Sequence, residues 1–288
     1  MSTAELAEPL IGKLLSRHGG TTPEEAIERF VSRQLRETGQ NRLPVDVDLM
    51  TSVLGIRQRV WSYPFAGRIY ADESGQLVMD LNSVDPQPRR RFTCAHEMLH
   101  LAFPGFKQEA RYRLDRSTGT YERERALEEY LCDYGAALTL MPTDLVVGRY
   151  RIEDGLAGVE RLKADAQVSL EAAGIRLVKL ADTPCAFVVL EVGHKPADLK
   201  RLRRGESVPP ELRVKYGVVK QMPFVPRFKS ADPDGPLVEA LDRDGVVTGY
   251  GFLPGAVDDR LVYIEALRLG RRESEESPLR VVAIARAP

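Results

Sequence analysis

Three residues near the middle of the chain have the types and spacing of a catalytic metal site. His96, Glu97 and His100 form an H-E-x-x-H pentad. On a helix, residues four apart share a face, so the two imidazoles can converge on one ion. Glu97 lies about 100° round the helix from His96, which suits a carboxylate that takes a proton from a metal-bound water instead of binding the metal. The alternative is an ordinary helix that carries two histidines by accident.

The surrounding sequence predicts the helix that this pentad needs. Asp85 offers an N-cap and Pro86 follows it as the first helical residue. Pro104-Gly105 is a helix-stopping pair. Apolar residues recur at helical spacing and flank the two histidines: Phe92, Ala95, Leu99, Ala102 and Phe103.

A zinc site needs a third protein ligand and, when catalytic, one open position. A second long helix is predicted over residues 121–140, and on it Glu129 and Asp133 share a face. Glu129 can complete a His-His-Glu site, and Asp133 can accept the free ring N–H of a ligand histidine. Glu128 is the rival ligand, but only Glu129 has an aspartate four residues later. In the alternative interpretation these residues belong to an ordinary charged helix. The donor set accepts Zn²⁺, and also Mn²⁺, Fe²⁺ or Co²⁺.

Both segments resemble the signatures of one family, the ImmA/IrrE metallopeptidases. Residues 91–100 resemble its R-F-T-x-A-H-E-x-x-H motif, and residues 129–142 resemble its E-x-x-C-D…A-A…L-M-P segment. The resemblance extends from about Pro44 to Leu180. Two positions depart from the pattern. Leu99 stands where the family commonly has glycine, which would narrow the space near the metal, and Gly135 stands where an aromatic residue is usual, which would affect packing.

The resemblance implies a zincin-like fold and a zinc endopeptidase. His96, His100 and Glu129 would bind the metal, Glu97 would be the general base, and Asp133 would orient a ligand histidine. The implied substrate is a helix-turn-helix transcriptional repressor, whose cleavage induces a response to radiation, desiccation or DNA damage. The resemblance also implies a helix-turn-helix-like segment after Pro142, and some family members carry a GAF-like sensor domain after it.

Composition indicates a soluble globular protein. The chain has 288 residues, of which 43% are hydrophobic and 29% charged, and its net charge of −1 gives no overall attraction to nucleic acid or anionic lipid. The three cysteines form no C-x-x-C pair, which favours a reducing compartment. The sequence shows no signal-peptide pattern and no apolar run long enough to cross a membrane. We therefore expect a cytoplasmic protein with no membrane partner.

The predicted fold class is α+β, with three parts. Residues 1–142 form the metallopeptidase-like domain, with predicted helices over 4–18, 22–39 and 46–54 and a small sheet from strands 56–61, 67–71 and 77–81. An edge strand of that sheet can pair with an extended substrate. The long polar connection over residues 105–120 either borders the cleft or is a surface loop.

Residues 143–182 form the helix-turn-helix-like segment, with predicted helices over 155–166 and 169–180. This segment has six Lys and Arg residues against seven Asp and Glu residues, so it lacks the basic surface of a DNA reader. We interpret it as structural packing or a protein-docking surface, and we do not expect direct DNA binding.

Residues 183–288 form a sheet-rich α+β domain, GAF-like by resemblance, which would sense a small-molecule or protein signal or recruit the repressor. Five apolar runs separated by turn residues predict its strands, over residues 185–192, 214–219, 246–252, 261–267 and 279–285. A basic helical stretch over residues 197–204 is interpreted as a solvated face in preference to a nucleic-acid patch, and His194 is expected to be exposed.

Two alternatives to a peptidase remain. One is a DNA-binding regulator whose metal is structural. The other is a metal-dependent interaction protein that binds a partner without cutting it.

Overall fold

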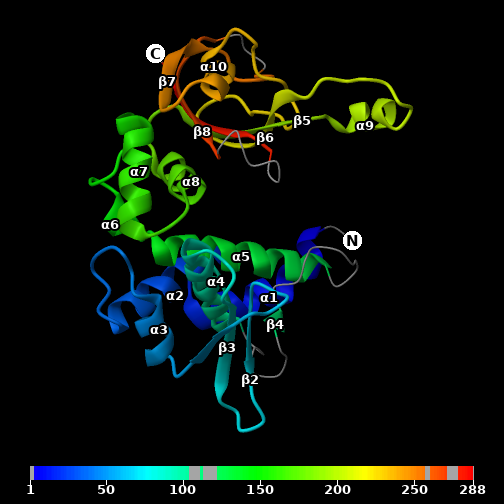
Figure 1. Ribbon diagram of the computed structural model, residues 1–288. Helices are drawn as coiled ribbons and strands as arrows, with labels where there is room; N and C mark the ends of the chain where they lie inside the picture. The colour runs from blue at the N-terminus through cyan, green and yellow to red at the C-terminus, as the bar shows by residue number, and fades with distance from the viewer. Residues whose placement is uncertain (1–2, 104–110, 113–121, 257–259, 271–277, 288) are drawn as a thin grey trace. The chain divides into compact units, whose positions relative to one another are not determined.

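The computed structural model describes residues 3–103, 111–112, 122–256, 260–270 and 278–287 (Figure 1). The chain divides into two compact units. Unit 1 comprises Met1–Val146 and Ala164–Ser169, and unit 2 comprises Val147–Lys163 and Leu170–Pro288. Among the described residues, no helix combines the length and the apolar character needed to cross a membrane.

Unit 1 begins with three helices at the predicted places: α1 (Thr3–His18), α2 (Pro23–Glu37) and α3 (Val47–Val53). Polar side chains fix where two of them begin. Thr22 accepts a hydrogen bond from the Glu25 backbone N–H, and Asp46 accepts one from the Leu49 N–H. These bonds satisfy backbone donors that have no partner within the helix.

A small mixed sheet follows, formed by β1 (Arg57–Trp61), β2 (Gly67–Ala71), β3 (Leu77–Asn82) and the short β4 (Arg111–Tyr112). The strand order is β1-β3-β2-β4, in which β1 pairs with β3 in parallel and the other pairs are antiparallel. The first three strands confirm the sequence-based prediction. Strand β4 lies in the connection for which the sequence predicts no strand.

Helix α4 (Gln87–Leu99) carries the H-E-x-x-H segment and packs on strands β2 and β3, and α5 (Glu122–Leu140) packs on α4 (Figure 1). The prediction that Asp85 is the N-cap is wrong. Pro86 occupies that position, with extended backbone and no side-chain cap bond. After Leu99 the chain tightens into the 3₁₀ helix η1 (His100–Ala102), so the α-helix ends before Pro104-Gly105. Those two residues lie outside the described part.

The segment after Pro142 contains α6 (Thr143–Val146), η3 (Ile152–Asp154), α7 (Gly155–Ala166) and α8 (Leu170–Leu180). The two predicted helices are therefore present, within one residue of the predicted bounds. Helix α8 belongs to unit 2, where it packs on strands β5 and β6.

Unit 2 is built on a five-stranded antiparallel sheet of order β6-β5-β9-β8-β7. The strands match the five apolar runs: β5 (Cys185–Gly193), β6 (Glu211–Lys220), β7 (Val246–Gly251), β8 (Val262–Leu269) and β9 (Arg280–Arg286). Because side chains alternate along a strand, each strand serves both faces. Gly174 of α8 lies against Phe187, whereas neighbouring Val188 joins the core cluster that contains Leu237 of α10 (Pro236–Asp242). The two helices thus cover opposite faces, and the α+β prediction is confirmed.

The basic stretch between β5 and β6 contains the short helix α9 (Pro196–Leu202). His194, just before it, is partly buried, and its Nε2 lies 2.8 Å from the Val208 carbonyl oxygen. The expectation of an exposed His194 is therefore wrong. Its ring joins the two ends of the segment between the strands.

Candidate metal centre

The two histidines of the pentad lie side by side in the interior of unit 1. His96 is on α4 and His100 is the first residue of η1, and each is 1% exposed. Their ring centroids are 5.2 Å apart at an interplanar angle of 74°. The i, i+4 spacing therefore brings the imidazoles together as the sequence predicted, in a site largely shielded from water.

Each imidazole is held through its Nδ1 atom by a carboxylate from α5. His96 Nδ1 lies 2.8 Å from Asp133 Oδ1, and His100 Nδ1 lies 2.8 Å from Glu128 Oε1. An ionised carboxylate has no proton to donate, so it accepts the hydrogen bond from a ring N–H. Each neutral ring therefore carries its proton on Nδ1 in this arrangement. The Nε2 atoms are then the metal-binding nitrogens.

Glu129 lies on the Nε2 side of His96, with its Oε2 atom 3.1 Å from that nitrogen. Two ligands of one tetrahedral zinc ion are separated by about 3.3 Å, given bonds of about 2.0 Å. The spacing therefore fits neighbouring ligands. Burial opposes ionisation of Glu129 most strongly, but in the metal-free protein His96 and His100, when protonated, together hold its pKa below the ordinary value. Glu129 is thus favoured as a carboxylate, the form that binds metal.

The Nε2 atom of His100 is buried and has no hydrogen-bond partner among the residues that the structure describes. An unsatisfied buried nitrogen is costly unless something binds it. Together with the carboxylate of Glu129, this nitrogen makes a donor set that fits a divalent metal of the zinc type.

Cys132 is a further candidate ligand that the sequence analysis did not consider. Its sulfur, with His96 and His100, forms a buried group whose ligand atoms all lie within 4.8 Å of one another. Its Sγ lies 3.6 Å from His100 Nδ1, on the side of the ring that Glu128 occupies. Burial, reinforced by the charges of Glu128 and Glu129, raises the pKa of the thiol well above its ordinary value. Without a metal Cys132 is therefore a neutral thiol, and its position favours Glu129 as the third ligand.

Glu97 is fully buried between α4 and strand β2. A β-carbon on Gly67 would lie 3.4 Å from Glu97 Cγ and only 2.3 Å from Thr93 Cγ2. Glycine at the start of β2 therefore lets the strand approach the helix beside the predicted general base. The sequence analysis does not find this role, because Gly67 stands there only as the first residue of a predicted strand.

The two departures from the family pattern face each other. A β-carbon on Gly135 would lie 2.5 Å from Leu99 Cδ1 and 2.8 Å from Ile27 Cγ2. Leu99 thus fills the space that a side chain at residue 135 would need, and it is fully buried there. The large residue at position 99 and the small residue at position 135 therefore compensate for each other at the α4–α5 contact.

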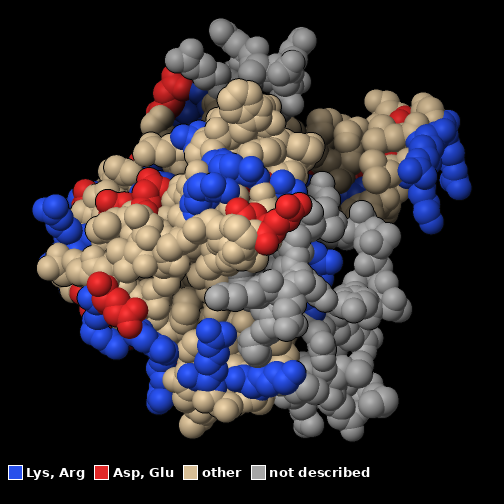
Figure 2. Space-filling view, turned by 90° about the horizontal axis from the view of Figure 1, so that it is seen from below, with Lys and Arg blue, Asp and Glu red and all other residues tan. Residues whose placement is uncertain are grey.

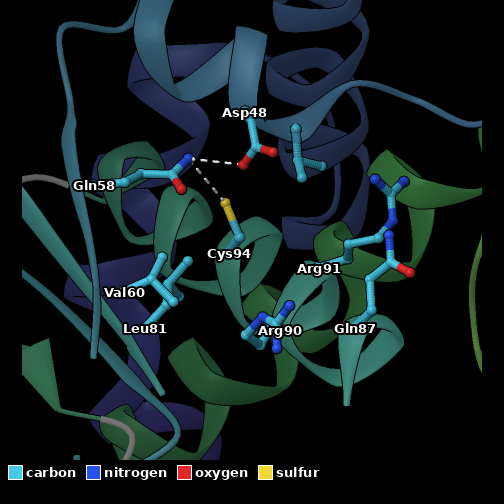
Figure 3. A pocket seen from close by; sticks show the side chains of 9 residues that line it. Asp48, Gln58, Val60, Leu81, Gln87, Arg90, Arg91 and Cys94 are labelled. Atoms are coloured by element: carbon cyan, nitrogen blue, oxygen red, sulfur yellow. Dashed lines mark hydrogen bonds between the residues drawn. The ribbon is translucent and has the colours of Figure 1, made fainter. Parts of the chain in front are cut away.

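The opposite face of α4 borders a separate cavity of about 250 Å³ (Figure 3). Cys94 lies on this face, about 200° round the helix from His96. Gln58 approaches its sulfur at 3.7 Å and donates to Asp48 at 3.1 Å. Burial raises the pKa of Cys94, so the thiol is protonated. This cavity is not part of the metal centre.

The structure therefore brings together four of the predicted site residues, His96, His100, Glu129 and Asp133, and Glu97 is buried next to His96 on α4. It also adds Glu128, the rival ligand, as the partner of His100 Nδ1. The signal for this role was the presence of two adjacent glutamates on α5. The predicted contribution of the connection over residues 105–120 lies almost entirely outside the described residues.

Comparison with known proteins agrees with this geometry. Residues 62–178 match the M78 peptidase family model, described as the IrrE N-terminal-like domain, so the chain contains such a domain. The fold is similar to that of a solved Mycobacterium tuberculosis transcriptional regulator, with a TM-score of 0.59 and 14% sequence identity, over 100% of this chain and 82% of that one. No curated protein matches the chain in sequence.

Proposed function

We propose that this protein is a zinc-dependent endopeptidase. The observation that carries the proposal is the pair of buried imidazoles whose Nδ1 atoms each meet a carboxylate at 2.8 Å, within an IrrE N-terminal-like domain. Such partners fix the ring orientation and raise the basicity of the remaining nitrogens, as in many zinc sites. Histidines that only packed in the protein core would not need both rings oriented, with their Nε2 atoms beside a third donor.

His96, His100 and Glu129 would hold the metal, and Asp133 and Glu128 would orient the two imidazoles. When bound, the zinc ion supplies Lewis acidity, lowering the pKa of water and polarising the scissile carbonyl. Mn²⁺ or another divalent ion also suits these donors.

Glu97 would act as the general base. Its carboxylate lies next to His96 in the sequence and outside the His–carboxylate pairs that orient the rings. It would take the proton from the attacking water as the new C–O bond forms, and would then deliver that proton to the leaving amine as the peptide C–N bond breaks. Because the carboxylate is buried, proton transfer occurs in a medium of low dielectric constant, where charge interactions are strong.

The substrate class follows from family resemblance and is the less direct part of the proposal. We infer that the protein cleaves a helix-turn-helix transcriptional repressor in the cytoplasm and thereby induces a stress response to radiation, desiccation or DNA damage. Unit 2 would act as a GAF-like sensor domain that binds a small-molecule or protein signal, or it would recruit the repressor. Similarity in fold to a transcriptional regulator supports a regulatory setting.

The test is co-incubation of the full chain with the helix-turn-helix repressor encoded nearest its gene. Wild type and Glu97→Gln are compared, each with zinc and with a chelator, and zinc affinity is measured in parallel by competition with a chromophoric chelator. We expect zinc-loaded wild type to cleave the repressor at a single peptide bond. Glu97→Gln should lose at least a hundredfold in rate, within the range of general-base effects of about 10²–10⁴, while keeping its zinc affinity. Equal cleavage by Glu97→Gln would refute the assignment of the base. A repressor that binds but stays intact would favour the interaction protein.

A further inference from the structure

The segment that joins β5 to β6, residues 194–210, forms a basic arm. Between Lys195 and Glu206 it has five cationic residues and two carboxylates, a net charge of +3 in a chain whose total is −1. Figure 1 shows α9 extending beyond the ends of β5 and β6, and Figure 2 shows Lys and Arg side chains gathered at this projecting end. Positive charge is therefore concentrated on one protruding element of unit 2.

The arm has a well-anchored base. Arg213 on β6, only 7% exposed, donates to the Gly193 carbonyl oxygen at 3.3 Å and lies 3.5 Å from Asp198 Oδ2. Asp198 is itself buried and accepts from the Lys195 backbone N–H at 3.2 Å. The contact of His194 with the Val208 carbonyl closes the arm at its root. One of the arm's two carboxylates is thus committed to internal contacts.

The other carboxylate, Glu206, pairs with Arg201 at 2.7 Å. The side chains of Lys200, Arg203 and Arg204 are exposed and have no ion-pair or hydrogen-bond partner among the residues that the structure describes. They occupy positions i, i+3 and i+4, and Arg203 continues the helical conformation of α9. Residues at this spacing are neighbours on one face, where like charges repel. A polyanion would relieve that repulsion.

We propose that the basic arm binds the sugar–phosphate backbone of double-stranded DNA without reading its sequence. Duplex DNA carries one negative charge per about 1.7 Å of axis, so adjacent cations on one face can each meet a phosphate. The arm has no Phe, Tyr or Trp, whereas single-strand binding relies on aromatic stacking. Protein interfaces are built around apolar and aromatic anchors, and the only large apolar side chain exposed on the arm is Leu199. A duplex backbone is the polyanion that needs cations alone.

This inference is independent of the metal centre. It also revises two expectations from sequence. One is that the protein does not bind DNA directly, which rested on the charge count of residues 143–182, and the other is that the basic stretch over residues 197–204 is only a solvated face. An arm that binds the DNA sugar–phosphate backbone would hold the protein near DNA, where a DNA-bound repressor would be found.

The test uses the full chain and a fluorescein-labelled duplex of about 24 base pairs, followed by fluorescence anisotropy at several salt concentrations. Wild type is compared with the triple variant Lys200→Gln/Arg203→Gln/Arg204→Gln. The matched control is Arg57→Gln/Arg161→Gln/Arg243→Gln, which removes three exposed cations that are each paired with a carboxylate. Both variants change the net charge equally. Thermal unfolding of each variant checks that the fold is retained.

We expect saturable binding by wild type that is insensitive to the duplex sequence. The arm variant should bind at least tenfold more weakly, and its slope of log K against log salt should be shallower by about 2.7, or about 0.9 for each phosphate that is no longer neutralised. The control should stay within twofold of wild type. Equal weakening in both variants, or unchanged binding by the arm variant, would overturn the proposal. So would competition by polyglutamate as strong, per charge, as that by unlabelled duplex, because this outcome would assign the arm to an acidic protein.

Discussion

Both units bury charged side chains, but in different settings. In unit 1 the interior around α4 and α5 holds two imidazoles and the carboxylates Glu97 and Glu128. In unit 2 the sheet core is a large cluster of Val, Leu, Ile and Ala side chains, and the exposed cations of the basic arm stand outside it. Burying charge is costly unless it is paired. Unit 1 carries this cost among the side chains of the candidate metal centre, whereas the core cluster of unit 2 contains no charged residue.

Another buried carboxylate of unit 1, Asp80, shows how the candidate metal centre differs from an ordinary buried ion pair. Asp80 is fully buried, but Arg59 and Arg68 contact its two oxygens at 2.7 and 2.6 Å. Burial opposes its ionisation, yet these arginines hold its pKa below the ordinary value. At the metal centre the carboxylates Glu128, Glu129 and Asp133 face imidazoles instead. A divalent cation would supply there the positive charge that the arginines supply to Asp80.

The effect that should distinguish the two units most clearly is therefore that of metal on unit 1. At a zinc concentration about 1,000 times the dissociation constant, binding to the folded state adds roughly 4 kcal/mol to its stability. Hydrogen exchange should show slower exchange in α4 and α5 on zinc addition and no change in β5 and β9 of unit 2. Equal protection of both units, or of neither, would contradict the assignment.

The two units can also be destabilised separately through tightly packed glycines. Gly135→Ala should lower the stability of unit 1 by about 1–3 kcal/mol, because overpacking forces Leu99 to move. Gly174→Ala should do the same to unit 2, where the new methyl group would lie 2.4 Å from the Phe187 ring. Urea unfolding with unit-specific hydrogen exchange measures both.

Because Leu99 and Gly135 pack against each other, changing both residues tests this packing more sharply than changing either one. Leu99→Ala alone should cost about 2–5 kcal/mol through the cavity it leaves. Combined with Gly135→Ala, the destabilisation should be smaller than the sum of the two single effects, because the new methyl group occupies part of that cavity. Strict additivity would show that the two residues do not compensate.

The carboxylates that orient the imidazoles should have a somewhat smaller effect. Asp133→Asn and Glu128→Gln should each weaken zinc binding by about 10–100-fold, since an amide is a poorer partner for the ring N–H. Asp144→Asn, an exposed change just beyond α5, is the control. Competition with a chromophoric chelator gives the affinities, and a cobalt-substituted spectrum reports the ligand geometry. If Glu128→Gln alone altered the cobalt spectrum as removal of a ligand would, Glu128 would be a ligand and not a partner of His100.

The smallest effect is a pH dependence confined to unit 1. Burial lowers the pKa of His18, and Arg17 and Arg33 lower it further against the hydrogen bond to Ala102. The unfolded chain therefore binds a proton that the folded chain resists, so stability falls as the pH drops below the ordinary value of 6.5. His18→Gln should reduce this fall between about pH 7.5 and about pH 5.5 in urea unfolding. An identical pH profile for both proteins would exclude His18 as the cause.

The amino-acid sequence alone was enough to predict most of the secondary structure and the pairing of the two histidines in the candidate metal centre. Periodicity and turn residues predicted both long helices, the first three strands of the small sheet and all five strands of unit 2. The i, i+4 spacing placed His96 beside His100 because helical geometry is local and depends on no distant contact. Asp133, one turn after Glu129, was identified on the same ground.

Contacts between elements, in contrast, were settled by the folded molecule. The sequence could not show that Glu128 faces His100, because the rotation of α5 about its axis is set by packing on α4. The same packing pairs Leu99 with Gly135, and the packing of β2 on α4 places Gly67 against Thr93 and Glu97. Nor could it show the basic arm as a projecting element, because that depends on the antiparallel pairing of β5 with β6 and on the buried contacts of Arg213. The spacing of residues within one helix or strand follows from the sequence alone, whereas contacts between elements form only when their faces pack.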